Sequence, residues 1–407
     1  MSKENNTSTK QFYNATIPSD WEVKRFGSVC KKLLDGTHFS PKSKDGPFKY
    51  ITSKNIRNEG LDLGNINYVS KEEHIEIFKR CPVQFGDILL TKDGASVGAC
   101  CFNTLREEFS LLSSVALLRT DSNKMISEYL LQFIKSPIGQ KIIQDEISGQ
   151  AITRITLEKI RFFKITLPPL PEQRSISHVL SLMDSAINQN NQLIVQKELQ
   201  KKWLMQNLLT GKKRLKGFGG KWKKLGAGEV FKSITVKGFE DEVLLSATQD
   251  RGIIPRTMLV GRVTMPDGTT AGYKLVEPGD FVISLRSFQG GLEYSYYRGI
   301  VSPAYIVLKP KQKINDEFYK QYYKSYEFIG RLATAVIGIR DGKQISYDDY
   351  CLVKIPFPSY EEQSAIAQVL QAADKEIQLL KTKTEKLREQ KKGMMQVLLT
   401  GKKRLKI

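Results

Sequence analysis

The feature that most constrains this chain is an internal repeat with a constant offset of 190 residues. LPPLPEQRSI begins at Leu167 and its degraded copy FPSYEEQSAI at Phe357, while LLTGKKRLK begins at Leu208 and again at Leu398. Because both ends of the repeated segment keep the same offset, no insertion or deletion separates them. A fold built around one active site has no need of such a duplication, so the sequence predicts two equivalent units.

Each repeated segment has the apolar period of a long packed helix. Alternating steps of four and three residues form an a/d seam over about five heptads. Pro171 suits a first helical turn, Gly211 and Gly401 suit helix ends, and a helix of roughly 38 residues would be about 57 Å long. We expect the two helices to bury their seams against each other as an antiparallel coiled coil, the alternative being that each packs only on its own domain. The apolar seam residues are Ile176, Leu180, Met183, Ile187, Ile194, Leu204 and Leu208, followed by Ile366, Leu370, Ala373, Ile377, Leu380, Leu387, Met394 and Leu398.

The segments that precede the two helices are similar in order and different in their loops. FGDILLTKDGASVG in the first corresponds to PGDFVISLRSFQGG in the second, and both segments then continue with one amphipathic helix and a last strand before the long helix. Short β-branched strands separated by glycine turns predict α+β domains of about 140 to 150 residues. A repeated frame with divergent loops indicates two domains that bind different things.

The charge of the chain favours a polyanionic partner. The 63 Lys and Arg residues against 43 Asp and Glu residues give a net charge of +20, which is typical of nucleic-acid-binding proteins. The sequence contains no apolar run long enough to span a membrane and starts without a signal peptide, so we expect a cytoplasmic protein. Five cysteines without C-x-x-C spacing and three scattered histidines predict reduced thiols and no metal site.

The segments follow one another along the chain as domain, long helix, domain and long helix. In this order they resemble the specificity (S) subunits of type I DNA restriction-modification systems. The resemblance extends from Trp21 to Lys406 and rests on LPPLPEQRSI with its copy, the two LLTGKKRLK segments, and GDILLTKDGASVG. The second copy departs from the pattern at the helix entry, where Tyr360 and Glu361 replace Leu170 and Pro171. The expected division is an N-terminal tail at 1–17, target recognition domains at 18–168 and 212–358, long helices at 169–211 and 359–401, and a basic tail at 402–407.

The resemblance implies a non-catalytic DNA reader that serves host defence. Each target recognition domain would read one half of an asymmetric, bipartite double-stranded DNA target. The paired helices would dock two methyltransferase (M) subunits, and restriction (R) subunits would join this core. S-adenosylmethionine would belong to the M subunits and ATP to the R subunits, so the chain itself is expected to hold no cofactor.

The sequence offers no catalytic motif of its own. The one PP dipeptide lies in LPPLP, which is not the [DN]-P-P-[YF] motif of an adenine methyltransferase, and GIRDGKQ from Gly338 has the wrong spacing for a phosphate-binding P-loop. A D-x-K triplet at Asp341 to Lys343 has no acidic counterpart in the first domain, where Ala151 to Thr153 takes its place. A self-contained DNA methyltransferase or nuclease, and a structural scaffold with incidental charge, remain the alternatives.

Candidate DNA contacts follow from side-chain chemistry and from corresponding loops. Arg and Lys bind guanine edges or phosphates, and Asn and Gln bind adenine through two hydrogen bonds. The basic TGKKRLK segments could touch phosphate, or could simply suit the C-terminus of a helix. In the first domain the candidates are Lys54, Asn55, Arg57, Lys92, Ser96, Gln150 and Arg154, and in the second they are Arg286, Ser287, Gln289, Arg340, Lys343 and Gln344.

Overall fold

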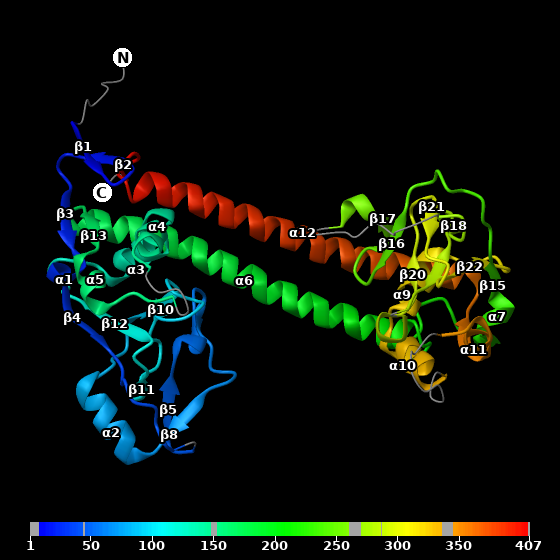
Figure 1. Ribbon diagram of the computed structural model, residues 1–407, viewed down its shortest axis with the longest axis horizontal. Coiled ribbons are helices and arrows are strands. Elements are labelled where there is room, and N and C mark those ends of the chain that lie inside the picture. Colours follow the sequence, from blue (N-terminus) through cyan, green and yellow to red (C-terminus); the bar gives the residue numbers. More distant parts are fainter. Residues whose placement is uncertain are drawn as a thin grey trace. The chain divides into compact units, whose positions relative to one another are not determined.

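The chain divides into two compact units, each of which contains one domain and parts of both long helices. The computed structural model describes residues 8–43, 45–147, 153–259, 270–285, 287–335 and 345–405. Unit 1 is Met1–Gln192 with Lys381–Ile407, and unit 2 is Leu193–Leu380 (Figure 1). The units therefore cut across both predicted helices, because antiparallel pairing brings the end of one helix to the start of the other.

Unit 1 is an α+β domain. Its elements before the long helix are β1 (Thr9–Phe12), β2 (Ala15–Pro18), β3 (Glu22–Arg25), α1 (Phe26–Val29), β4 (Cys30–Asp35), β5 (Phe48–Ile51), a 3-10 turn (Ser53–Asn55), β6 (Ile56–Arg57), β7 (Gly60–Leu61), β8 (Asn67–Val69), α2 (Lys71–Arg80), β9 (Ile88–Thr91), β10 (Cys100–Phe102), β11 (Ser110–Leu111), β12 (Val115–Thr120), α3 (Ser127–Lys135), α4 (Pro137–Asp145), α5 (Leu157–Phe162) and β13 (Lys164–Leu167).

Unit 2 repeats this frame with fewer insertions. Its elements between the long helices are β14 (Lys223–Gly226), α7 (Ala227–Val230), β15 (Phe231–Ile234), β16 (Leu245–Thr248), β17 (Gly252–Pro255), a 3-10 turn (Arg256–Met258), β18 (Lys274–Val276), β19 (Phe281–Ile283), α8 (Ser287–Gly290), β20 (Glu293–Tyr294), β21 (Gly299–Val301), β22 (Ile306–Pro310), α9 (Asp316–Tyr323), α10 (Tyr326–Ala335), α11 (Tyr347–Leu352) and β23 (Lys354–Phe357).

The same antiparallel sheet lies at the centre of both domains. Its strand order is β10-β9-β12-β4 in unit 1 and β20-β19-β22-β15 in unit 2. In each domain the last strand before the long helix pairs with the first strand after a tryptophan, β13 with β3 and β23 with β14. Unit 1 adds a three-stranded sheet, β11-β5-β8, beside α2. The repeat predicted from the helices therefore extends to the topology of the domains.

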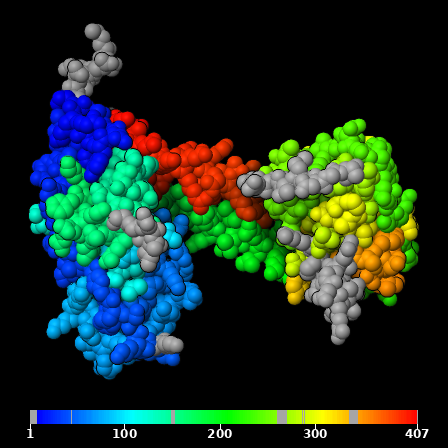
Figure 2. All heavy atoms as spheres, viewed as in Figure 1, coloured from blue at the N-terminus to red at the C-terminus, as the bar shows by residue number. Residues whose placement is uncertain are grey.

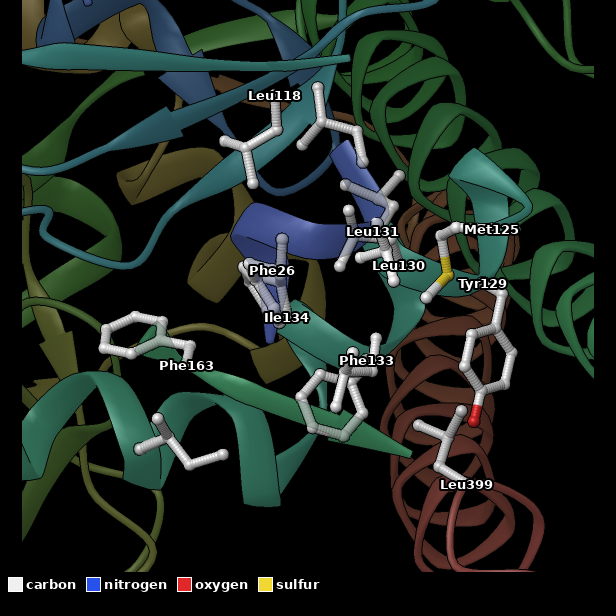
Figure 3. Close-up of a cluster of buried hydrophobic side chains, with 14 of the residues drawn as sticks. Phe26, Leu118, Met125, Tyr129, Leu130, Leu131, Phe133, Ile134, Phe163 and Leu399 are labelled. Atoms are coloured by element: carbon white, nitrogen blue, oxygen red, sulfur yellow. The ribbon is translucent and has the colours of Figure 1, made fainter. Parts of the chain in front are cut away.

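The core of unit 1 includes residues from both ends of the chain. Phe26 packs edge to face against Phe133 and against Phe163, and Leu399, which follows the second long helix, is buried in the same cluster (Figure 3). Burial of these side chains removes apolar surface from water and supplies the main favourable free energy of the unit. The end of the chain is thus a structural part of unit 1.

The residues expected to form a tail at 1–17 are structured in part. β1 and β2 form an antiparallel hairpin, in which Phe12 and Ile17 are buried. A Cβ added at Gly401 would approach Pro18 within 2.5 Å, so the carboxyl-terminal segment packs closely on this hairpin (Figure 2). The expected tail is corrected accordingly: residues 9–17 form part of a hairpin that contributes Phe12 and Ile17 to the core of unit 1 and packs on the end of the second long helix.

The long helices have equal length, and within each unit their segments run antiparallel. α6 is Leu170–Leu208 and α12 is Tyr360–Leu398, each of 39 residues. Every seam residue predicted from the sequence is buried or half-buried. Most positions between them are exposed, as expected for a coiled coil that buries one stripe of each helix.

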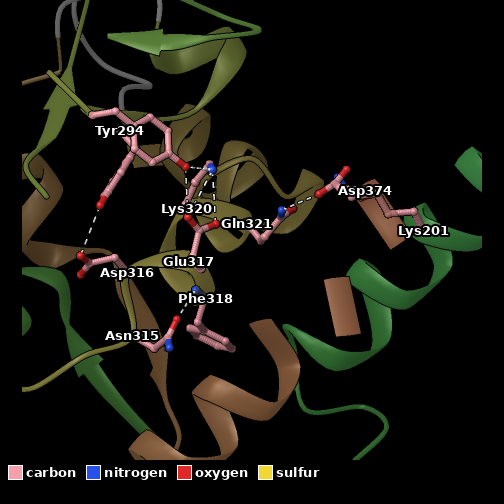
Figure 4. Close-up of polar contacts among 10 residues, drawn as sticks. Lys201, Tyr294, Asn315, Asp316, Glu317, Phe318, Lys320, Gln321 and Asp374 are labelled. Atoms are coloured by element: carbon pink, nitrogen blue, oxygen red, sulfur yellow. Dashed lines mark hydrogen bonds and ion pairs between the residues drawn. The ribbon is translucent and has the colours of Figure 1, made fainter. Parts of the chain in front are cut away.

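A charged pair interrupts the apolar seam of unit 2. The Lys201 ammonium donates to one carboxylate oxygen of Asp374 at 2.6 Å, and the Gln321 side chain of α9 donates to the other oxygen at 2.9 Å (Figure 4). The carboxylate thereby joins α6, α12 and the recognition domain. A polar contact at a seam position fixes the register of paired helices, because any other register would leave it unpaired.

Unit 1 contains the same contact at the repeat offset. Lys391 donates to Asp184 at 2.5 Å, and Gln132 of α3 donates to the other carboxylate oxygen at 2.7 Å. Burial lowers the pKa of the Lys391 ammonium, and the hydrogen bond to Asp184 opposes this shift. Because helix-to-helix and domain-to-helix contacts share one carboxylate in both units, the repeat preserves the way in which each domain attaches to the coiled coil.

The repeated Glu-Gln pair at the start of each long helix and the repeated TGKKRLK segments meet at the junction of domain and helices. In unit 2, Glu362 at the start of α12 is buried and accepts from Arg214 at 2.5 and 2.6 Å and from the Trp222 indole at 2.9 Å. These hydrogen bonds raise the pKa of the Arg214 guanidinium. This arginine of TGKKRLK therefore binds a carboxylate of its own chain.

The junction of unit 1 uses the corresponding residues. Glu172 at the start of α6 accepts from Arg404 at 2.5 and 2.7 Å and from the Trp21 indole at 3.2 Å. The next residue, Gln173, donates to the carbonyl of Pro168 and accepts from the amide of Ile126. The motif residues that repeat most closely are thus those that hold each domain on the helices.

Candidate nucleic-acid interface

The loop between β9 and β10, residues 92–99, is the first candidate DNA contact of unit 1. Gly94 and Gly98 have φ angles of 96° and 94°, a region that glycine enters without strain. Lys92 is only 1% exposed, and its ammonium lies 3.0 Å from Asp93 and 3.6 Å from Asp35. The expectation that Lys92 contacts DNA is therefore corrected: burial between two carboxylates makes it a structural anchor of the loop.

The segment that precedes α5 lies on this loop. The Ile155 amide donates to the Lys92 carbonyl at 2.8 Å, and the Gly94 amide donates to the Thr153 carbonyl at 2.9 Å. The Arg154 guanidinium lies 3.3 Å from Asp93, and its side chain is 53% exposed. Asp93 thus pairs with Lys92 and orients Arg154. Arg154 presents a positioned cation, and Ser96 of the same glycine loop is half-buried.

The second candidate loop of unit 1 is the segment from Thr52 to Asp62. Asn55 is buried, its amide group donates to the carbonyls of Asp62 and Asn65 at 3.0 and 3.3 Å, and its side-chain oxygen accepts from the Thr52 amide. The expected role of Asn55 as an adenine contact is corrected, because the backbone of its own loop occupies its hydrogen-bonding groups. Lys54 and Arg57 of the same segment are exposed.

In unit 2, the loop that follows β19 corresponds to the glycine loop. Ser287 is buried and its hydroxyl accepts from the Ser284 amide at 2.8 Å, so it shapes the turn, which corrects its expected role in DNA contact. Gln289 is exposed. The other candidates lie outside the described residues: Gln150, Arg286, Arg340, Lys343 and Gln344.

Lys324, the residue that follows α9, holds the candidate loop of unit 2 together with the turn between β16 and β17. The Lys324 ammonium donates to the Gly290 carbonyl at 3.0 Å, to the Gln249 carbonyl at 3.3 Å and to the buried Glu293 at 2.6 Å. Gly290 belongs to the loop after β19, and Gln249 to the turn between β16 and β17. Burial raises the pKa of the Glu293 carboxyl, and the hydrogen bond from Lys324 opposes that shift.

Unit 1 holds its two candidate loops in a related way. Lys135, at the end of α3, donates to the Asn58 carbonyl in the turn between β6 and β7. Gln140 of α4 donates to the Gly98 carbonyl in the glycine loop at 3.0 Å. The sequence reasoning missed these positioning residues. The signal that could have found them is the shared Q-x-x-K-S of QFIKS and QYYKS, which places Lys135 and Lys324 at equivalent positions.

Two kinds of site are missing from the described residues. In the part of the chain that the structure describes, no group of three or more His, Cys, Asp and Glu side chains is arranged to bind a metal ion. None of the helices in the described ranges combines the length and the apolar content that a membrane crossing requires. The arrangement instead offers two sets of loops, each held by buried charges on the same frame.

Comparisons with known proteins agree with this architecture. The profile of the family described as "Type I restriction modification DNA specificity domain" matches residues 18–200 and 268–389. The putative type I restriction enzyme MjaX specificity subunit of Methanocaldococcus jannaschii is 28% identical, with coverage of 96% of this chain and 95% of its own. The MjaVIII specificity subunit of the same organism is 26% identical, with coverage of 98% and 96%.

Solved structures share the fold at lower identity. The S subunit of a type I restriction-modification system from M. genitalium is 16% identical and superimposes with a TM-score of 0.56 over 98% of both chains. A chain from a structural study of complex assembly and conformational transition of the type I system is 17% identical. It has a TM-score of 0.60 and covers 95% of this chain and 99% of its own.

Proposed function

We propose, from the premise that this chain belongs to the type I restriction-modification DNA specificity family, that its two recognition domains read the two halves of a bipartite DNA target. The observation that carries the proposal is the pairing of a repeated frame with different loops. Both units attach to the helices through the same Asp, Lys and Gln contacts. The loops of the two units differ in sequence, so one chain presents two different readers at fixed attachment points.

The proposed DNA contacts are the exposed members of the predicted set. In unit 1 Lys54, Arg57 and Arg154 supply exposed cations and the half-buried Ser96 supplies a hydroxyl, and in unit 2 Gln289 is exposed. Cations can bind phosphate or guanine, and glutamine can bind adenine through two hydrogen bonds. The candidates outside the described residues remain part of the proposal because they belong to the same loops in the sequence.

The partners follow from the family. We propose that the paired helices α6 and α12 dock two methyltransferase subunits and that restriction subunits join this core. The methyltransferase subunits would bring S-adenosylmethionine and the restriction subunits ATP. In this arrangement the present chain contributes recognition and assembly, and the methylation and cleavage steps occur on its partners.

Methylation and salt dependence test the proposal directly. The chain alone is expected not to methylate DNA, while its complex with the cognate M subunit methylates one duplex sequence. Binding by the complex should fall steeply with salt, roughly a thousandfold between 50 and 200 mM if six phosphates are contacted. Electrophoretic mobility shifts and incorporation of labelled methyl groups measure both. Methylation by the chain alone, abolished by a point mutation within it, would favour a self-contained enzyme, and a flat salt response would favour a scaffold.

Lys324→Met is expected to weaken target binding by about tenfold, because it removes the anchor of the unit 2 candidate loop and of the turn between β16 and β17. The loss should be confined to one half of the target. Discrimination against base changes in the half-site read by unit 2 falls, and discrimination in the other half-site is unchanged. Lys320→Met is the matched control, because Lys320 lies one turn earlier on α9 and binds Tyr296 and Glu317. Equal loss in both half-sites would contradict a positioning role.

A further inference from the structure

The second half of α6 exposes an apolar stripe that the helix pair does not use. Val195, Leu199 and Trp203 are 56%, 62% and 47% exposed and follow one another at intervals of four residues. Residues at this spacing lie on one face of a helix. The seam residues Ile194 and Leu208 of the same segment are buried, so the stripe faces away from α12.

The equivalent segment of α12 has no such stripe. At the repeat offset, Glu385, Glu389 and Gly393 take the places of Val195, Leu199 and Trp203, and all three are exposed. Leu193, Tyr360 and Leu379 add three further exposed large apolar side chains to the helical segments of unit 2, whereas in those of unit 1 Leu182 is the exposed large apolar side chain among the described residues. The two copies therefore share a seam and differ on their outer faces.

This difference calls for a partner because the stripe contributes nothing to the coiled coil. Single exposed apolar residues are common on proteins, but an aligned row that ends in a tryptophan forms a contiguous patch of the kind found at interfaces. Exposed tryptophan is also enriched among the residues that dominate binding energy. A helix that remained in water would gain solubility from the charged residues that α12 carries at the same positions.

We propose that this stripe, Val195, Leu199 and Trp203, docks one methyltransferase subunit through an apolar helix or groove with an acidic rim. The acidic rim of the partner's surface is inferred from the basic residues that flank the stripe on this chain. Lys202 and Lys212 are exposed, and the Lys213 ammonium lies 4.6 Å from the centre of the Trp203 ring. Aliphatic side chains gain nothing from a phosphate backbone, so the patch suits a protein better than nucleic acid.

The proposal rests on the proposed function and adds an asymmetry to it. The outer face of α12 in unit 1 carries charges where α6 carries the stripe, so the second methyltransferase subunit lacks this apolar anchor. Two identical partner subunits therefore bind with different affinities. The one that contacts the stripe binds more tightly.

The test is a titration of the full-length chain with the cognate methyltransferase subunit, followed by native mass spectrometry and sedimentation. The wild type binds two subunits in two resolved steps. The double variant Leu199→Ala/Trp203→Ala weakens the tighter step by about thirtyfold or more, as expected for loss of an interface hot spot, and leaves the weaker step unchanged. The matched control, Glu385→Ala/Glu389→Ala at the equivalent positions, changes neither step by more than about threefold, as expected for rim charges. Circular dichroism verifies that both variants fold.

The other outcomes distinguish failure of this docking proposal from failure of the proposed function. If the double variant binds both subunits like the wild type, the stripe is not the docking surface, although the proposed function stands. If the wild type binds no methyltransferase subunit, the proposed function itself fails. A wild-type chain that dimerises alone through Leu199 and Trp203 would assign the stripe to a second copy. Loss of DNA affinity by the double variant without partner subunits would assign it to nucleic acid.

Discussion

A fragment that ends at Gly217 is expected to form a homodimer through its single long helix. In the whole protein, the first half of α6 packs on the last half of α12 within unit 1. The fragment lacks α12, so it exposes Ile176 and Leu180, which are otherwise buried. A second copy of the fragment can cover them with its own residues 193–216, because that segment repeats 383–406 at a constant offset.

The polar contacts are reproduced together with the seam. Lys201 of the second copy takes the place of Lys391 against Asp184, and Arg214 takes the place of Arg404 against Glu172. Sedimentation of the fragment at micromolar concentration measures the assembly. With the methyltransferase subunit, the dimer is expected to methylate a palindromic bipartite site, because both readers are then copies of unit 1.

A charge reversal supplies the control for this prediction. Lys201→Asp places two carboxylates together twice in each dimer, and like charges in contact cost several kcal/mol, so the dimer should weaken by more than about a hundredfold. Adding Asp184→Lys to the same fragment restores opposite charges and should restore the dimer. Helix pairing would be excluded as the basis of assembly if the fragment stays monomeric at all concentrations. It would also be excluded if the charge reversal leaves the dimer's dissociation constant unchanged.

Arg214→Met is expected to lower the free energy of unfolding by about 3 kcal/mol. The substitution leaves the buried Glu362 carboxylate without its cation, and removal of one partner from a buried ion pair costs about 3 to 5 kcal/mol. We expect the lower end of this free-energy range because the Arg214 side chain itself is 24% exposed. Urea unfolding followed by the fluorescence of Trp222, which donates to the same carboxylate, reports on this junction.

The adjacent lysine provides the comparison. Lys212→Met removes an exposed cation from the same segment and should change stability by less than about 0.5 kcal/mol. Arg404→Met should reproduce the loss at the equivalent junction of unit 1, where Glu172 is buried. If Arg214→Met is as stable as Lys212→Met, the basic segment does not hold the junction, and a role at the DNA phosphates becomes the better explanation of its repetition.

The sequence alone determined the repeat, the two long helices and the family. The offset of 190 residues and the heptad period need no tertiary information, because they are properties of neighbouring residues on one helix face. The predicted helical segments, 169–211 and 359–401, agree with α6 and α12 to within three residues at each end. The α+β frame with two recognition domains followed, and the family comparisons confirm it.

Only the tertiary structure decided which polar side chains reach solvent. The buried Lys92 pairs with Asp35, which lies 57 positions earlier in the sequence. Lys324 donates to the carbonyl of Gln249, which lies 75 positions earlier in the sequence. A local pattern cannot reveal such partners, because the sequence distance between two residues does not determine their distance in the fold. The same holds for Arg404, whose partner Glu172 lies 232 positions away. A basic residue in one of these loops is therefore a structural anchor where the fold places a buried carboxylate beside it. Where the fold places none, the residue remains an exposed cation.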